Sequence, residues 1–343
     1  LSGFTRVAET AGKYVHGNLY LSYAELGSLL QPVVSPGAFP RTERFNDFAQ
    51  WGSLDIDLKE DAWLFSGMTV AGDTAAQWLE IFRGQSPVRG EILSAVPSNA
   101  ITLFSMGISD PESFREHLED YLGKSGHLPA YRAEEKRLQS VLGSSPLTDL
   151  LEVMDDEVVA FTLDPDASGN SSRLVMYEVS SASRAMEMIA GWVDGYAEER
   201  GLDRETLVDE YVLDQQTSYR IFHIPMVFYE GLLPETFMDT YMALYDHYLV
   251  FSDNRLALER TIYQNVLHKT LVNEPAYEDF SEYVSTRSNL TCIVKPGPFV
   301  EMASALLNAE GLRLAASLEP LLRKVHGMVF QLMRAGEMYY GNI

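Results

Sequence analysis

The stretch Trp51–Gly72 restricts the fold of this chain more than any other part of the sequence. Apolar and polar residues alternate in it on both sides of a short charged break at Lys59–Asp61. Such period-two alternation predicts an antiparallel hairpin with one solvated face. A degraded copy of the pattern ends the chain, with a break at Arg334–Gly336 and a second apolar run at Met338–Ile343. We therefore predict that the chain is built on an internal repeat.

Charge and composition exclude some classes of protein. The 343 residues include 49 acidic and 26 basic side chains, which gives a net charge of −23. A field of this sign repels phosphate backbones, so we expect no nucleic acid partner. A hydrophobic fraction of 46% is enough to build sizeable cores. The single cysteine, Cys292, cannot form an intrachain disulfide, and its apolar surroundings predict a small buried side chain.

The two ends of the sequence lie inside predicted elements. Leu1 lies within a helical pattern and Ile343 within a strand pattern. No apolar run approaches the roughly 18 residues that a membrane-spanning helix needs. We expect the chain to be a fragment of a longer protein, and any membrane anchor to lie outside it.

One local unit occurs five times. It consists of a short apolar strand, a Ser, Asp or Pro that stops it, and an amphipathic helix. The junction side chain is expected to cap the first helical turn, and Ser109 with Glu112 has the spacing of a capping box. The five strands are Asn18–Leu21, Ile101–Ile108, Leu174–Val179, Tyr248–Phe251 and Leu290–Val294.

Other strands read as hairpins, for example Val158–Leu163 with Arg173–Val179. Because hairpins dominate over parallel crossovers, we predict an α+β fold. It should consist of antiparallel sheets with amphipathic helices packed on one face, in tandem repeated copies.

The repeat also defines the predicted domains. Asn18 matches Asn289 and Gly67 matches Gly341, at offsets of 271 and 274 residues. Residues 1–90 are therefore interpreted as the C-terminal half of a first copy, and 91–343 as a second copy truncated at its C-terminal end. We expect 1–90 and 275–343 to superpose strand for strand, with about three residues of insertion or deletion in the loop after the second helix. The last strand should leave an exposed edge near Tyr339.

The second copy resembles a family of uncharacterised bacterial envelope proteins, as in Bacteroidota, catalogued as a domain of unknown function. The resemblance rests on four segments: Val96–Ile108, Leu150–Asp166 with the strand and helix that follow it, Tyr245–Ile262 and Pro275–Val294. It implies an extracytoplasmic, membrane-anchored protein whose globular part follows an N-terminal transmembrane helix. It implies no activity, because the matching motifs are structural.

The most suggestive loop for metal binding is 164–170. Asp164, Asp166, Ser168 and Asn170 place oxygen ligands near the spacing of a calcium loop, with Gly169 at the sixth position. The twelfth position is Val175, where a bidentate Glu is needed, and strands flank the loop in place of helices. We favour a polar hairpin turn and keep a calcium site as the alternative.

The other candidate residues are predicted to have structural roles. Asp55 and Asp57 share a strand face and could form a carboxylate pair, but their spacing is typical of a solvated strand face. Asp155–Glu157 precedes a strand and is predicted to form a turn. No His pair has the helical spacing of a zinc hydrolase, and His223 in an apolar strand is expected to be a core or edge residue. No nucleophile elbow and no phosphate-binding glycine loop is present.

These observations predict a protein without a catalytic site and without a cofactor. Its expected role is that of an interaction or scaffold protein of the cell envelope, with a protein partner. The alternatives are a carrier of an apolar ligand or lipid in a sheet-lined cavity, and an enzyme of unrecognised type.

Overall fold

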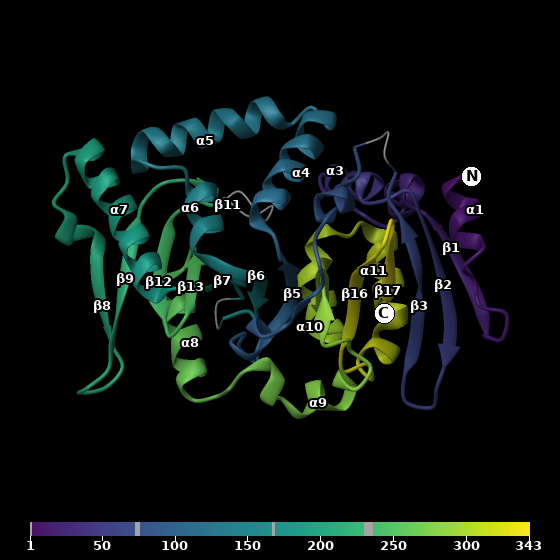
Figure 1. The fold of residues 1–343 in the computed structure, drawn as a ribbon. Helices are drawn as coiled ribbons and strands as arrows, with labels where there is room; N and C mark the ends of the chain where they lie inside the picture. The colour runs from purple at the N-terminus through teal and green to yellow at the C-terminus, as the bar shows by residue number, and fades with distance from the viewer. Residues whose placement is uncertain (1, 73–75, 167–168, 230–235) are drawn as a thin grey trace. The chain divides into compact units, whose positions relative to one another are not determined.

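The computed structural model describes residues 2–72, 76–166, 169–229 and 236–343. The chain is 41% helical and 30% strand with antiparallel sheet, which confirms the α+β class (Figure 1). It forms two compact units, each made of separate segments. Unit 1 contains Leu1–Arg89, Ile108–Gly126 and Ala276–Ile343, and unit 2 contains Gly90–Gly107 and His127–Pro275. The division into 1–90 and 91–343 describes repeat copies and stays a prediction.

Unit 1 contains six strands that pair antiparallel in the order β1-β2-β3-β17-β16-β15. The predicted hairpin at Trp51–Gly72 is confirmed as β2 and β3, and the one at the end of the chain as β16 and β17. The strands are β1 (Gly17–Ser22), β2 (Trp51–Leu58), β3 (Trp63–Val70), β15 (Leu290–Val294), β16 (Met328–Ala335) and β17 (Met338–Asn342). A separate short pair joins β4 (Val88–Arg89) to β14 (Arg287–Ser288).

A palindromic row of residues crosses this sheet. Directly opposed residues read Leu19, Leu54, Gly67, Gly341, Leu332 and Leu290 from β1 to β15. The loops that precede the hairpins also meet, because Val34 and Leu307 form an antiparallel bridge. The two three-stranded halves of unit 1 therefore have the same strand order and pairing, and they meet at Gly67 and Gly341.

The expected exposed edge near Tyr339 is wrong. β17 pairs with β16 on one side and with β3 on the other, so neither edge of this strand is free. Tyr339 is 2% exposed, and its hydroxyl donates a hydrogen bond to the carbonyl of Leu79 at 2.7 Å. The sequence pattern could not show this, because β3 is more than 260 residues distant in the chain.

Seven helices belong to unit 1 among the residues that the structure describes. α1 lies against β2 and β3, and α10 lies against α11. The helices are α1 (Gly3–Ala8), α2 (Leu26–Leu30), α3 (Phe39–Thr42), α4 (Pro111–Lys124), α9 (Pro275–Ser281), α10 (Pro296–Ala303) and α11 (Ala309–Leu322).

Unit 2 contains seven strands that pair antiparallel in two runs, β5-β6-β7-β13 and β13-β12-β9-β8. The strands are β5 (Ala100–Gly107), β6 (Met154–Leu163), β7 (Arg173–Val179), β8 (Val208–Val212), β9 (Ser218–Ile224), β12 (Thr240–Tyr245) and β13 (Tyr248–Ser252). The short strands β10 (Phe228–Tyr229) and β11 (Thr236–Phe237) form a pair of their own.

The central strands of unit 2 are buried on both faces. Residues 174–179 of β7 and all of β13 are buried, although successive side chains point to opposite faces. Both faces of these two strands are therefore covered, and the prediction that the helices pack on one face stays a prediction. Figure 1 shows α7 (Ala182–Arg200) and α8 (Arg255–Val266) beside this sheet, where α7 contacts β9 and β12 and α8 contacts β12 and β13.

Two further helices, α5 (Leu128–Leu142) and α6 (Pro146–Val153), pack against α7 in unit 2. Trp192 of α7 is 1% exposed, and its indole N–H donates to a carboxylate oxygen of Asp149 at 2.7 Å. Gly195, one turn later, touches the backbone of Leu142 in α5. These contacts confirm a core position for the apolar face of α7.

The strand–helix units are confirmed, but in three of the five the capping residue lies one or two positions later than predicted, and Ser22 and Lys295 make no side-chain cap in the other two. Asp110 caps α4 by accepting the N–H of Ser113, so the Ser109–Glu112 capping box does not form. Ser181 caps α7, and Asn254 caps α8. The cap is the last extended residue, and the extended backbone continues further than the apolar pattern does.

Candidate functional site: a buried carboxylate cluster and an exposed leucine helix

A wide bulge at the start of β6 gathers acidic residues in unit 2. Met154 pairs with Val179, and the next pair is Val158 with Tyr177. Three residues of β6, 155–157, therefore lie opposite a single residue of β7, Glu178. The bulge directs Asp156 and Glu157 toward Glu178 of β7. The predicted turn at Asp155–Glu157 is therefore wrong, since these residues belong to β6.

Glu157 and Glu178 are both buried, at 2% and 9% exposure. Burial raises the pKa of Glu157 from 4.5 to about 8, and the charges of Glu178 and Asp156 also raise it. The N–H of Ile92 donates a hydrogen bond to Glu157 at 2.9 Å, and this bond lowers the pKa. The cluster therefore holds a proton at neutral pH.

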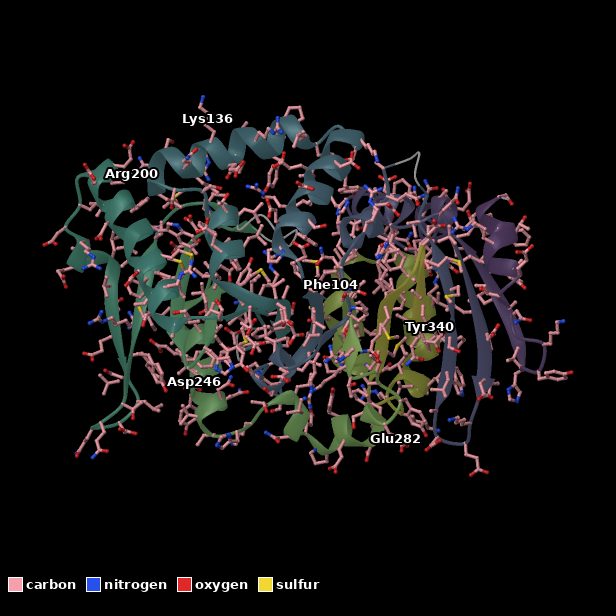
Figure 2. The ribbon with its side chains drawn as sticks, viewed as in Figure 1. Phe104, Lys136, Arg200, Asp246, Glu282 and Tyr340 are labelled. Carbon is pink, nitrogen blue, oxygen red and sulfur yellow. The ribbon has the colours of Figure 1, made fainter. Side chains whose placement is uncertain are left out.

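Glu178 has a histidine neighbour, His247. Burial raises the pKa of Glu178, and the charge of His247 opposes this effect. The Nε2 atom of His247 lies 3.3 Å from a carboxylate oxygen of Glu178. His247 belongs to the tight turn between β12 and β13, beside Asp246, which has a left-handed φ of 50° and is labelled in Figure 2.

The oxygen atoms of Asp156, Glu157 and Glu178 lie within 4.8 Å of one another, and in the described part of the chain these three residues could together hold a metal ion. Carboxylates are ligands for hard cations such as Ca²⁺ and Mg²⁺. Like charges at this distance also resist joint ionisation. The sequence analysis did not predict this cluster. The signal that could have indicated it is an acidic residue, Glu178, within an otherwise apolar strand.

The candidate calcium loop lies between β6 and β7, and Ser168 falls outside the described residues. The N–H of Asn170 donates to the side chain of Asp166 at 3.0 Å, and the N–H of Asp166 donates to the carbonyl of Asn170 at 2.9 Å. The N–H of Asp164 donates to the carbonyl of Asn99 at 3.0 Å. These bonds form a polar turn of the favoured kind, and the calcium site stays a prediction.

Two other candidates have structural partners. Asp55 accepts hydrogen bonds from the N–H of Gly12 at 2.9 Å and from the side chain of Asn18 at 2.7 Å. His223 lies 2.6 Å from Asp239 and its ring stacks on Tyr241 at 4.3 Å. His223 is thus a partnered strand residue, as predicted. Burial raises the pKa of Cys292 to about 11, in keeping with a thiol in apolar surroundings.

Helix α11 in unit 1 exposes an unusual amount of apolar surface. Leu312, Leu314, Leu318 and Leu321 are 45%, 48%, 41% and 43% exposed, and Gly311 is the buried residue of this helix. Leu314, Leu318 and Leu321 share one helical face because they are spaced three to four residues apart. In contrast, α7 buries its apolar face. Large exposed apolar patches mark interaction sites.

Comparison of this chain with protein-family models, with curated proteins and with solved structures gave no match. The fold and the two sites therefore define the class of the protein: an α+β protein with antiparallel sheets, a buried carboxylate cluster and an exposed apolar helix. The resemblance to the envelope family stays a prediction. Across the described residues, no helix has the length and apolar character needed to cross a bilayer.

Proposed function

We propose that this chain is a non-catalytic interaction or scaffold protein that binds a partner protein through α11. The observation that carries the proposal is the row of exposed leucines on that helix, each more than 40% exposed. Leu314, Leu318 and Leu321 share one face of α11, and we call these three residues the leucine surface.

The charge of the chain favours a protein partner over a bilayer. A net charge of −23 is repelled by anionic lipid headgroups, and the repulsion extends over a Debye length of about 8 Å at physiological salt. Apolar side chains flanked by charged ones are typical of the centre and rim of a protein interface. Arg313 and Arg323, each paired with a Glu on the same helix, supply such a rim.

We further propose that the chain consists of tandem repeated copies. The palindromic row centred on Gly67 and Gly341 supports this, because two copies of one module would pair in this way. In this register the counterparts differ by 271 residues at Leu19 and Leu290, by 278 at Leu54 and Leu332, and by 274 at the glycines. The second copy thus has seven more residues than the first before its hairpin, and four fewer within the hairpin. The net difference is the three residues expected, but it is divided between two places.

The resemblance supports an extracytoplasmic location in the bacterial cell envelope, with a membrane anchor outside this chain. Cell fractionation of the full-length gene product tests this part of the proposal. We expect the protein in the membrane fraction, exposed to protease on the extracytoplasmic side. Recovery in the soluble cytoplasm would contradict it.

The binding role is tested with a photocrosslinking amino acid at Leu318, applied to envelope extract. The protein that is captured is then purified, and its affinity is measured for the wild type and for the double variant Leu314→Asp/Leu318→Asp. We expect the double variant to lose at least about tenfold in affinity, since buried apolar anchors dominate interface energies.

The matched control is Leu256→Asp, because Leu256 is 61% exposed but belongs to α8 of unit 2 and is not one of the residues of the leucine surface. It should bind as the wild type does. Equal affinity of the double variant and the wild type would refute the interaction role. Release of a bound lipid on denaturation, without any protein partner, would favour the carrier in its place.

A further inference from the structure

One side of α11 carries a stripe of exposed residues that includes two leucines of the leucine surface. Members of the stripe are three or four positions apart, as neighbours on one helical face are. We call the α11 stripe the five exposed residues Glu310, Leu314, Ser317, Leu321 and Lys324. Lys324 lies in the turn after the helix, where its N–H donates to the carbonyl of Leu321 at 2.9 Å, so it continues the stripe. Gly311, the buried residue of the helix, is not part of it.

The α11 stripe is symmetric about Ser317 in everything but the sign of its terminal charges. Glu310 lies seven residues before Ser317 and Lys324 seven residues after it, with one leucine between Ser317 and each charge. A second copy of α11 laid antiparallel across the first would therefore set Leu314 against the partner's Leu321. It would set Glu310 against the partner's Lys324, and each of these contacts would occur twice. The stripe is thus complementary to itself in both shape and charge.

We propose that the partner of the leucine surface is a second copy of this chain, and that two α11 helices pair antiparallel about a two-fold axis at Ser317. This inference rests on the proposed binding role of α11 and names its partner. The contact is isologous, with leucines at its centre and ion pairs at its rim. Ser317 is small enough to let the helices approach, and its hydroxyl already donates to the carbonyl of Leu314 at 2.7 Å. It therefore brings no unpaired donor into the contact.

Charge selects this pairing over a parallel one. A parallel pair would set Glu310 against the partner's Glu310 and Lys324 against the partner's Lys324, and such like-charge contacts are unfavourable. In the antiparallel pair both charges find a partner. Glu310 binds Arg313 through Oε2 alone, at 3.1 Å, which leaves Oε1 for the partner's Lys324. In the described part of the chain, the Lys324 ammonium group has no ion pair of its own.

The local charge of α11 also suits contact between two copies. Residues 309–324 carry three basic and two acidic side chains, a local charge of +1, whereas the whole chain carries −23. Two copies that meet at most other surfaces would bring acidic groups together, and like charges within about 8 Å repel at physiological salt. At α11 this repulsion is absent, so the helix is a favourable place for the chain to meet its own copy.

Analytical ultracentrifugation of the whole chain tests the pairing. One pair of helices is a contact at the small end of the usual range, so we expect monomer and dimer to exchange between about 1 and about 500 µM. Glu310→Lys and Lys324→Glu each turn both ion pairs into like-charge contacts, and each should weaken dimerisation at least about tenfold. The double variant Glu310→Lys/Lys324→Glu restores both ion pairs and should dimerise as the wild type does.

An equimolar mixture of the two single variants gives the sharpest result. Each variant alone has only like-charge contacts, but a dimer of one with the other has two ion pairs, so the mixture should regain wild-type dimerisation. Glu187→Lys is the matched control, because Glu187 is exposed on α7 of unit 2 and the change in net charge is the same as in Glu310→Lys. This control should dimerise as the wild type does.

A cysteine on the axis supplies a second measurement. A residue on a two-fold axis meets its own copy, so Ser317→Cys should form a covalent dimer under mild oxidation. Ala316→Cys is its control, since Ala316 is exposed on the same helix but points about 100° away from Ser317. The wild type, whose one thiol is Cys292, should remain uncrosslinked.

Three outcomes would overturn the second copy as partner: a wild type that is monomeric up to about 500 µM, single variants whose mixture regains no dimer, or undiminished dimers of Leu314→Asp/Leu318→Asp. The binding role of α11 survives these outcomes if the photocrosslink at Leu318 captures a different protein whose affinity falls in Leu314→Asp/Leu318→Asp. It fails separately if that double variant binds the captured protein as tightly as the wild type does.

Discussion

Helix α7 contains two glycines, one turn apart, with opposite surroundings. A Cβ atom added at Gly195 would lie 2.4 Å from the carbonyl oxygen of Leu142 in α5, whereas one added at Gly191 would meet nothing within 4 Å. Alanine is favoured over glycine inside a helix by about 1 kcal/mol at both positions. Gly191→Ala should therefore stabilise unit 2 by up to about 1 kcal/mol.

Gly195→Ala adds the same propensity but also a backbone clash. Because the atom that is met belongs to the main chain of α5, no side-chain rotation relieves the contact, and α5 and α7 must move apart. Overpacking of this kind costs about 3 kcal/mol at the upper end of its usual range. After the gain in propensity, we expect a net loss of about 2 kcal/mol, and a difference of about 3 kcal/mol between the two variants.

The assay is urea unfolding followed by fluorine NMR of 5-fluorotryptophan. Trp192 lies between the two glycines on α7 and is 1% exposed, so its resonance reports the unfolding of this helix, separate from Trp51, Trp63 and Trp78 of unit 1. The midpoints convert to free energies through a common m-value. If Gly195→Ala is as stable as Gly191→Ala, the close approach of α5 to α7 is wrong.

Three further predictions follow from individual side chains. Burial raises the pKa of Glu157 from 4.5 to about 8, so its contribution to the free energy of unfolding is complete below about pH 4.5 and is lost as pH rises through 8. The expected loss is about 5 kcal/mol. Chemical denaturation at a series of pH values should show this loss in the wild type but not in Glu157→Gln. Tyr339→Phe removes the hydrogen bond to the carbonyl of Leu79 and should cost about 0.5–1.5 kcal/mol in urea unfolding. Tyr340→Phe, at a ring that is 38% exposed and labelled in Figure 2, should change stability by less than about 0.5 kcal/mol. Equal effects of the two variants would contradict the hydrogen bond. Because burial raises the pKa of Cys292 to about 11, its reaction with a disulfide reagent at pH 8 should be about 100-fold slower in the native than in the unfolded chain, and similar rates would show an accessible thiolate.

The periodicity of apolar residues, and the residue types where strands give way to helices, were enough to predict the local structure. Alternation at Trp51–Gly72 predicted the β2–β3 hairpin, and the change from strand to helix spacing predicted α7 and α8, because these patterns reflect residues within one or two turns of each other. The cap positions were displaced, since a cap depends on where extended backbone ends and not on where apolar residues end.

Only the tertiary structure decided which distant segments meet, because pairing between strands depends on contacts that no local window contains. It brought β17 beside β3, which buried Tyr339 in place of exposing it. It gathered Glu157 and Glu178 at a bulge, where burial, a property of the whole fold, changes their acidity. It also left the leucines of α11 exposed, although their spacing is the same as that of a buried helix face. Sequence pattern specifies which face of an element is apolar, and the packing of the complete chain determines whether that face is covered.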